Sequence, residues 1–241
     1  MHRSKLLPIG LIALAAMSPT AARAVTYDVV ASFSATLNPN GPFSYGYRIG
    51  TGSFVPYNAS TAVCAGIAGL ACQYSSTFNT GNLPAVAINT TGALLVSGSV
   101  RVPTNELLLH PVGLDSGLPA GDTIVRFTAP ATSLYSVAGV FQTLDTRSNG
   151  GTVNVSIEGG TSVFAAPLTG PLNNTDPFNF TTLLAAGSTL DFVVNSAGSY
   201  FGDSTGLRAT LTTPSTAIPE PVSMMVLGLG LASLALVRRR T

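Results

Sequence analysis

Tryptophan is absent from the sequence, lysine occurs once, and charged residues make up only 9% of the 241 positions, where about a quarter is usual. The segment 25–218 contains five arginines, no lysine and nine acidic residues, which gives a formal charge of about −4. Binding to nucleic acid or to an anionic lipid surface requires clustered Lys and Arg, so charge excludes both partners. A neutral ligand suits this chain better.

Helical patterns of ten or more residues are also missing between residues 25 and 217, while 25 Gly and 16 Pro mark frequent turns. Residues 27–37 alternate between apolar and polar side chains, as a half-buried strand does. We predict further strands at 93–102, 106–109, 123–128, 134–141, 152–158, 161–165, 178–183, 189–194 and 207–212. Short alternating strands of this kind predict an all-β fold, an antiparallel β-sandwich of the jelly-roll type.

The first 24 residues have the pattern of a secretory signal peptide. A basic start at residues 1–5 precedes an apolar run at 6–17, which is too short to cross a membrane. Ala22 and Ala24 have the small-residue spacing of a cleavage site. We therefore predict cleavage by signal peptidase after Ala24 and an exported β-sandwich body over residues 25–217.

The last segment, 218–241, has the features of a short membrane anchor. A Pro-Glu-Pro motif precedes an uninterrupted apolar run at 222–237, which predicts a single transmembrane helix, and an arginine cluster follows the run. The motif and the cluster consist of Pro219, Glu220, Pro221, Arg238, Arg239 and Arg240. Because arginines beyond a span stay on the cytoplasmic side, the body is expected outside the inner membrane.

This tail resembles the PEP-CTERM sorting signal that exosortases of Gram-negative bacteria recognise. The resemblance covers residues 218–241, about a tenth of the chain. It implies cleavage at or near the Pro-Glu-Pro motif and transfer of the body to the cell surface or to an extracellular matrix such as that of a biofilm. The alternative is a plain C-terminal anchor, which would keep the protein permanently in the membrane.

A second resemblance concerns the body. The sequence Tyr-Ser-Val-Ala-Gly-Val-Phe at 135–141, together with segments at 109–111, 125–130 and 203–207, resembles a jelly-roll module of bacterial surface proteins. That module is similar in outline to galactose-binding-like and carbohydrate-binding domains, so the resemblance implies a jelly roll with a carbohydrate ligand. The lack of Trp weakens the sugar interpretation, because sugar-binding faces rely on flat aromatic rings.

Cys64 and Cys72 are the only cysteines. In an exported chain the first interpretation is a disulfide, which would close a loop within the Gly- and Ala-rich segment 62–71. The alternative is a pair of metal ligands, but His110 is the one other soft or borderline ligand in the body.

Other patterns that could carry chemistry have simpler structural interpretations. Gly-Asp-Ser-Thr-Gly at 202–206 matches a nucleophile elbow around Ser204, yet a strand is predicted after it and no His lies downstream. Asp203, with Asp145 and Asp191, is a weak Ca²⁺ candidate, because isolated Asp residues at strand ends are mostly turn caps. We predict no catalytic residue, no bound metal and no cofactor.

Two further groups of residues remain as candidates. Glu106 and His110 would share one face of a strand, although a catalytic site needs an orienting third group. Aromatic residues beside Gly, Pro or Asn are candidates for an exposed contact surface: Tyr45, Tyr47, Tyr57, Tyr200 and Phe201. We place the ligand contact at Tyr200 and Phe201.

These features together predict a non-enzymatic exported protein of the cell surface or matrix, processed by an exosortase, that binds exopolysaccharide weakly or has a structural role. The alternative from another class is a secreted polysaccharide hydrolase, which needs two carboxylates beside the glycosidic bond. The nine acidic residues of the body are scattered singly and nominate no such pair.

Overall fold

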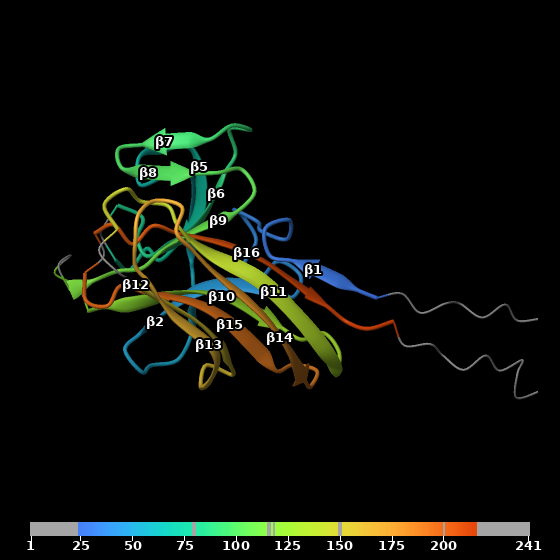
Figure 1. Cartoon of the computed structure of the whole chain (residues 1–241). Coiled ribbons are helices and arrows are strands. Elements are labelled where there is room, and N and C mark those ends of the chain that lie inside the picture. The colour runs from blue at the N-terminus through green and yellow to red at the C-terminus, as the bar shows by residue number, and fades with distance from the viewer. Residues whose placement is uncertain are drawn as a thin grey trace, which may run out of the picture. The chain divides into compact units, whose positions relative to one another are not determined.

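The computed structural model describes residues 24–215 except 79–80, 115–116, 118, 149–150 and 200, and these residues form two antiparallel β-sheets (Figure 1). Val25–Pro214 is one compact unit. The predicted tail at 218–241 and residues 1–23 of the predicted signal peptide lie outside the described residues. Within the described ranges, no helix has the length and apolar character that a membrane crossing needs.

Sheet A has the strand order β14-β11-β16-β9-β6-β5-β4, and β1 pairs with β16. Its strands are β1 (Thr26–Asp28), β4 (Ala59–Cys64), β5 (Ile67–Tyr74), β6 (Ala85–Asn89), β9 (Leu107–His110), β11 (Ser133–Thr143), β14 (Thr175–Leu184) and β16 (Thr205–Thr212). Sheet B has the order β13-β12-β15-β10-β2-β3. Its strands are β2 (Phe43–Ile49), β3 (Val55–Pro56), β10 (Gly121–Thr128), β12 (Gly151–Ile157), β13 (Thr161–Leu168) and β15 (Thr189–Asn195). A separate hairpin consists of β7 (Leu95–Ser97) and β8 (Val100–Val102).

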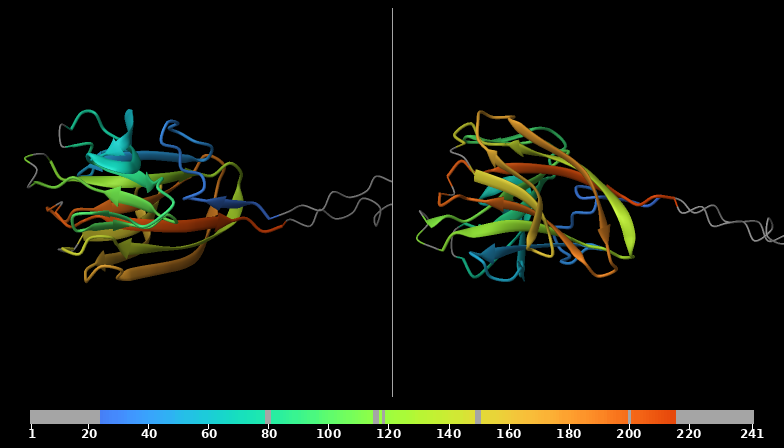
Figure 2. Two further views of the ribbon diagram at one scale, coloured as in Figure 1. Left: turned by 90° about the horizontal axis from the view of Figure 1, so that it is seen from above. Right: turned by 60° about the horizontal axis from the view of Figure 1, so that its bottom comes forward.

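The strand order is that of a jelly roll, as predicted. From β9 to β16 the chain passes back and forth between the sheets and builds two four-stranded layers, β14-β11-β16-β9 and β13-β12-β15-β10. The earlier strands widen both layers: β6, β5 and β4 extend sheet A beyond β9, and β2 and β3 extend sheet B beyond β10. β1 lies beside the end of β16, so the two ends of this unit are neighbours (Figure 2).

Alternate side chains of both sheets meet in one core between the layers. On β15, Leu190, Phe192 and Val194 are fully buried in it. The ring of Phe178, on β14 of the other sheet, lies 5.9 Å from that of Phe192, centroid to centroid. Removing this apolar surface from water supplies most of the stability of such a fold.

The strand predicted at residues 27–37 is wrong beyond Asp28. The Oδ1 atom of Asp28 accepts the backbone N–H of Val30 at 2.8 Å and that of Ala31 at 2.9 Å, and the chain turns away from its ladder with β16. A short acidic side chain that bonds to the following backbone competes with strand pairing in this way. The apolar residues that follow, such as Phe33, pack against the core from a loop.

The strands predicted between residues 106 and 212 correspond to β9–β16, whereas the earlier part of the body differs more. The stretch 93–102 is a hairpin, because the chain turns at Gly98 with a φ of 54°. The strands β2, β4, β5 and β6 were not predicted. The turn of the β4–β5 hairpin has positive φ at Ala65 and Gly66, 50° and 74°, as two-residue hairpins require. Alanine is unusual in such a turn, so the turn is hard to predict from the sequence.

Candidate ligand-binding site

The outward side of sheet A carries a second apolar cluster. On β9, Leu107 and Leu109 belong to the core between the sheets, while Leu108 faces the other way and joins Leu70 of β5. A cavity of about 170 Å³ opens beside this cluster, and we call it the cleft. Its lining includes Cys64, Ala65, Ile67, Leu70, Leu83, Ala85, Val100, Leu108, His110, Asp145, Arg147, Phe201, Gly202 and Ser204.

The predicted disulfide between Cys64 and Cys72 is present and supports one wall of the cleft. It joins the end of β4 to the middle of β5, and both cysteines are buried in the apolar cluster. The segment between them is therefore a cross-linked hairpin, and the wall that it forms is fixed by a covalent bond as well as by strand pairing.

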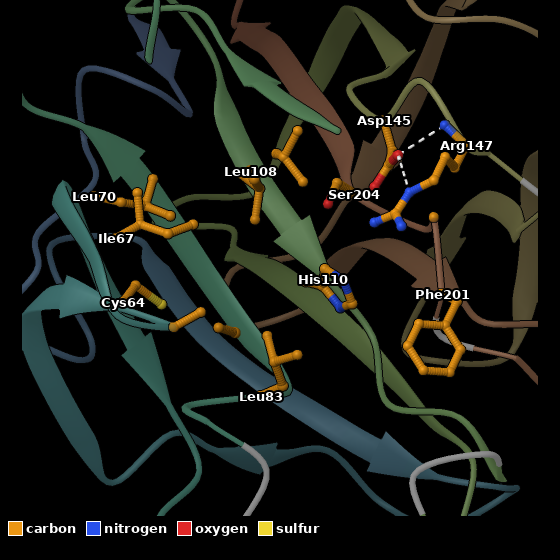
Figure 3. A pocket seen from close by; sticks show the side chains of 14 residues that line it. Cys64, Ile67, Leu70, Leu83, Leu108, His110, Asp145, Arg147, Phe201 and Ser204 are labelled. Atoms are coloured by element: carbon orange, nitrogen blue, oxygen red, sulfur yellow. Dashed lines mark hydrogen bonds and ion pairs between the residues drawn. The ribbon is translucent and has the colours of Figure 1, made fainter. Parts of the chain in front are cut away.

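His110 ends β9 and lies in the middle of the cleft. Figure 3 shows its ring between the apolar cluster and the Asp145–Arg147 pair. Its Nδ1–H donates to the carbonyl oxygen of Pro111 at 2.9 Å, which fixes the tautomer of the neutral ring. Burial lowers the pKa of His110, against smaller opposing effects of this bond and of Asp145. The imidazole is therefore neutral at pH 7 and presents no charge to a ligand.

Asp145 and Arg147 form the polar end of the cleft. The backbone N–H of Arg147 donates to Asp145 Oδ1 at 2.8 Å, and its side-chain Nε lies 4.0 Å from the same oxygen. The carboxylate is almost fully buried, whereas the Arg147 side chain is 77% exposed. The aspartate therefore fixes the backbone at Arg147, while the guanidinium is largely exposed and its donors are accessible to a ligand.

The aromatic contact predicted at Phe201 lies at the cleft, and Phe201 is 59% exposed. Its predicted neighbour in this role, Tyr200, lies outside the described residues. The prediction that Tyr45, Tyr47 and Tyr57 are exposed is wrong, because all three are buried in the core. Tyr45 and Tyr47 are alternate residues of β2 and so share its core side, and the ring of Tyr57 stacks on that of Tyr47.

The other predicted site residues, Ser204, Asp203 and Asp191, do not come together in one site. Ser204 lines the cleft and is followed by strand β16, as expected, and not by the helix of a nucleophile elbow. Asp203, the weak Ca²⁺ candidate, is buried, and Asp191 binds Arg126 on sheet B. In the part of the chain that the structure describes, no group of three His, Cys, Asp or Glu side chains could hold a metal ion.

Glu106 does not line the cleft, although it precedes β9 and so lies near His110 in the sequence. Its carboxyl group is fully buried against Gly206 of β16, where any side chain would collide with it. Neither oxygen has a hydrogen bond to a described residue, and burial raises the pKa of this group against the weaker effect of Arg208.

The cleft has an apolar part and a polar end. The lining is mainly apolar, one exposed aromatic ring stands beside it, and donors and acceptors gather at one end. Asp145 is the one carboxylate among the described residues of the lining. The strands form a jelly-roll β-sandwich, and the cleft lies on one of its outer faces.

No model of a known protein family matches the chain, and no curated protein matches it. Similar solved structures include a family 35 carbohydrate-binding module from Clostridium thermocellum, with 11% identity over 59% of this chain and 87% of that chain at a TM-score of 0.28. The C-terminal CBM6 of LamC, a laminarinase from Zobellia galactanivorans, is 10% identical over 66% and 93% of the two chains, with a TM-score of 0.27. These scores are too low to transfer a ligand to this chain.

Proposed function

We propose that this protein is a non-enzymatic carbohydrate-binding protein of the cell surface or matrix, and that the cleft holds one sugar unit of a neutral polysaccharide. The supporting observation is the exposed ring of Phe201 beside the Asp145–Arg147 pair, at the mouth of an apolar cavity. An aromatic ring can cover the apolar face of a sugar, and a carboxylate with a guanidinium can bond to its hydroxyl groups.

The charge of the body supports a neutral ligand. Residues 25–218 have a formal charge of about −4, so an acidic polysaccharide would be repelled at long range. Within the cleft, His110 is neutral and Arg147 is balanced by Asp145. A ligand without charge therefore enters the cleft without electrostatic repulsion and without the cost of taking a charge out of water.

The test is retention of the purified protein on immobilised laminarin, dextran, galactomannan and alginate, with an assay for newly formed reducing ends. We expect retention on at least one of the three neutral polymers, none on alginate, and no reducing ends. Phe201→Ala should weaken binding about tenfold, because it removes the stacking surface. Leu183→Ala is the matched control, since Leu183 is also a large exposed apolar residue, 69% against 59% for Phe201, but lies on β14 and does not line the cleft.

Two outcomes would contradict the proposal. Retention on alginate alone would show that charge, and not the cleft, governs binding. The appearance of reducing ends would favour a secreted polysaccharide hydrolase instead.

In this proposal the chain is exported by residues 1–24 and sorted by an exosortase through residues 219–221 and 238–240, after brief insertion in the inner membrane. The support is the order of these segments in the sequence. Deleting residues 219–241 should abolish surface localisation, and the mature wild type should lack the mass of its tail. A full-length protein that stays in the membrane fraction would show a permanent anchor instead.

A further inference from the structure

A second hollow, of about 310 Å³, lies on the outer face of sheet B. Strand alternation places it there, because Val125 and Phe127 of β10 belong to the core while Ile124 and Arg126 line the hollow. Residues 52–54 of the β2–β3 loop and residues 158–159 of the β12–β13 turn also line it. The hollow therefore faces away from the cleft, which lies on the outer face of sheet A.

Arg126 is held rigidly in this hollow. Its Nε and Nη2 donate to the two carboxylate oxygens of Asp191 at 2.7 and 2.8 Å, and the buried Asp191 lies directly opposite on β15. The ring centroid of Phe54 is 4.2 Å from the Arg126 Cζ atom. Gly46 makes room for that ring, since a side chain at position 46 would collide with it. A bidentate ion pair and an aromatic contact together fix the plane of the guanidinium.

The hollow offers both donors and acceptors to a ligand. The Arg126 side chain donates to described residues through Nε and Nη2, and its Nη1 has no acceptor among the residues that the structure describes. Glu158 is exposed at the hollow, and its Oε1 accepts a hydrogen bond from the Ser188 hydroxyl at 2.9 Å. A carboxylate has further lone pairs, so a ligand meets a fixed donor and a carboxylate acceptor.

The charges in the hollow nearly cancel. Arg126 is paired with Asp191, and Arg48 is paired with Asp122. Glu158 then leaves a formal charge of −1, which disfavours an anion. A sugar ring has neighbouring hydroxyl groups that can accept from Arg126 and donate to Glu158, and the mainly polar lining of the hollow suits such a ligand.

We propose that this hollow is a second sugar-binding site, and that one molecule of the protein crosslinks two polysaccharide chains by binding one on each outer face. This inference rests on the proposed function of the cleft. The outer faces of two packed sheets point in opposite directions, so a polymer bound on one face leaves the other face free. Two sites on one rigid body convert a binding protein into a crosslinker of the matrix.

The test is light scattering of the purified protein mixed with laminarin, dextran or galactomannan, together with direct binding to the same polymers. The wild type should raise the scattering above the sum of the separate components. The double variant Ser53→Leu/Glu158→Gln obstructs the hollow and replaces the Glu158 carboxylate with a neutral amide, but leaves both Arg–Asp pairs intact. This variant and Phe201→Ala should each still bind the polymer and lose most of the excess scattering. Ser136→Leu, an exposed position of β11 outside both sites, is the matched control and should scatter like the wild type.

The outcomes separate this inference from the proposed function. If the wild type binds a polymer but adds no scattering, or if Ser53→Leu/Glu158→Gln crosslinks as well as the wild type, the second site is wrong and the cleft stands. If Phe201→Ala abolishes all binding, the hollow does not bind sugar. If none of the three polymers is bound, both proposals are wrong.

Discussion

Opening the Cys64–Cys72 disulfide should destabilise the protein by a predictable amount. The bond has a sequence separation of 8, so it closes a loop of nine residues in the unfolded chain. In the chain-entropy treatment this loop corresponds to about 2.6 kcal/mol of unfolding free energy at 25 °C. For a body of this size, the same loss should lower the melting temperature by about 5–10 °C.

The assay is urea unfolding of the oxidised protein and of the protein reduced with dithiothreitol. The midpoint should fall on reduction, and the m-value should rise, because the reduced chain exposes more surface when it unfolds. The double variant Cys64→Ala/Cys72→Ala should lose more than reduction alone does, since both cysteines are buried and their sulfur atoms are removed. An oxidised and a reduced protein with the same midpoint would refute the reasoning. Binding to the cleft should weaken in parallel, because the hairpin forms one of its walls.

Three further changes test other parts of the structure. Burial raises the folded-state pKa of Glu106 above its usual 4.5, so the folded protein holds a proton there that the unfolded chain releases, and the free energy of unfolding should fall as the pH rises from 4.5 through the raised pKa. The urea midpoint of Glu106→Gln should therefore rise relative to that of the wild type over the same pH range. Arg126→Gln should lower the free energy of unfolding by about 3–5 kcal/mol, because it leaves the buried charge of Asp191 unpaired. Adding Asp191→Asn should recover much of this loss in thermal melts. Phe192→Ala should cost about 3–5 kcal/mol in chemical unfolding through the cavity left between the sheets.

The second half of the fold was predictable because its strands alternate plainly. On β15, every second residue from Leu190 to Val194 is apolar, and each of these is in the core. Near the N-terminus the alternation of apolar and polar residues predicts a strand that is not formed, because hydrogen bonds from the backbone N–H groups of Val30 and Ala31 to the Asp28 side chain turn the chain. The β4–β5 hairpin escaped prediction because β4 has no strongly apolar face and because β5 begins with a run of apolar residues and Gly that does not alternate with polar ones; a covalent bond supplies part of what holds the hairpin.

The candidate site was predictable in its parts and not in its assembly. His110, Asp145 and Phe201 were each noted in the sequence, but nothing local says that they share a cleft. They meet because β16 lies between β9 and β11: Thr205 pairs with Leu109 on one side and with Thr143 on the other. Register between strands so far apart in sequence depends on the packing of whole sheets, which a single sequence pattern does not contain. For the same reason, the sequence alone does not predict that Arg126 and Asp191 lie opposite each other on neighbouring strands.

The scarcity of charge in the sequence takes on a definite meaning in the structure. Three of the five body arginines are paired with aspartates: Arg48 with Asp122, Arg126 with Asp191, and Arg147 with Asp145. These pairs occur at the cleft and at the hollow, so each site gains planar hydrogen-bond donors with little net charge. At the hollow, hydrogen bonds to Asp122 and Asp191 also hold the guanidinium groups of Arg48 and Arg126 in place before a ligand arrives, which reduces the entropy lost on binding. A chain with few charges, most of its arginines already balanced, is therefore well suited to an uncharged ligand rich in hydroxyl groups.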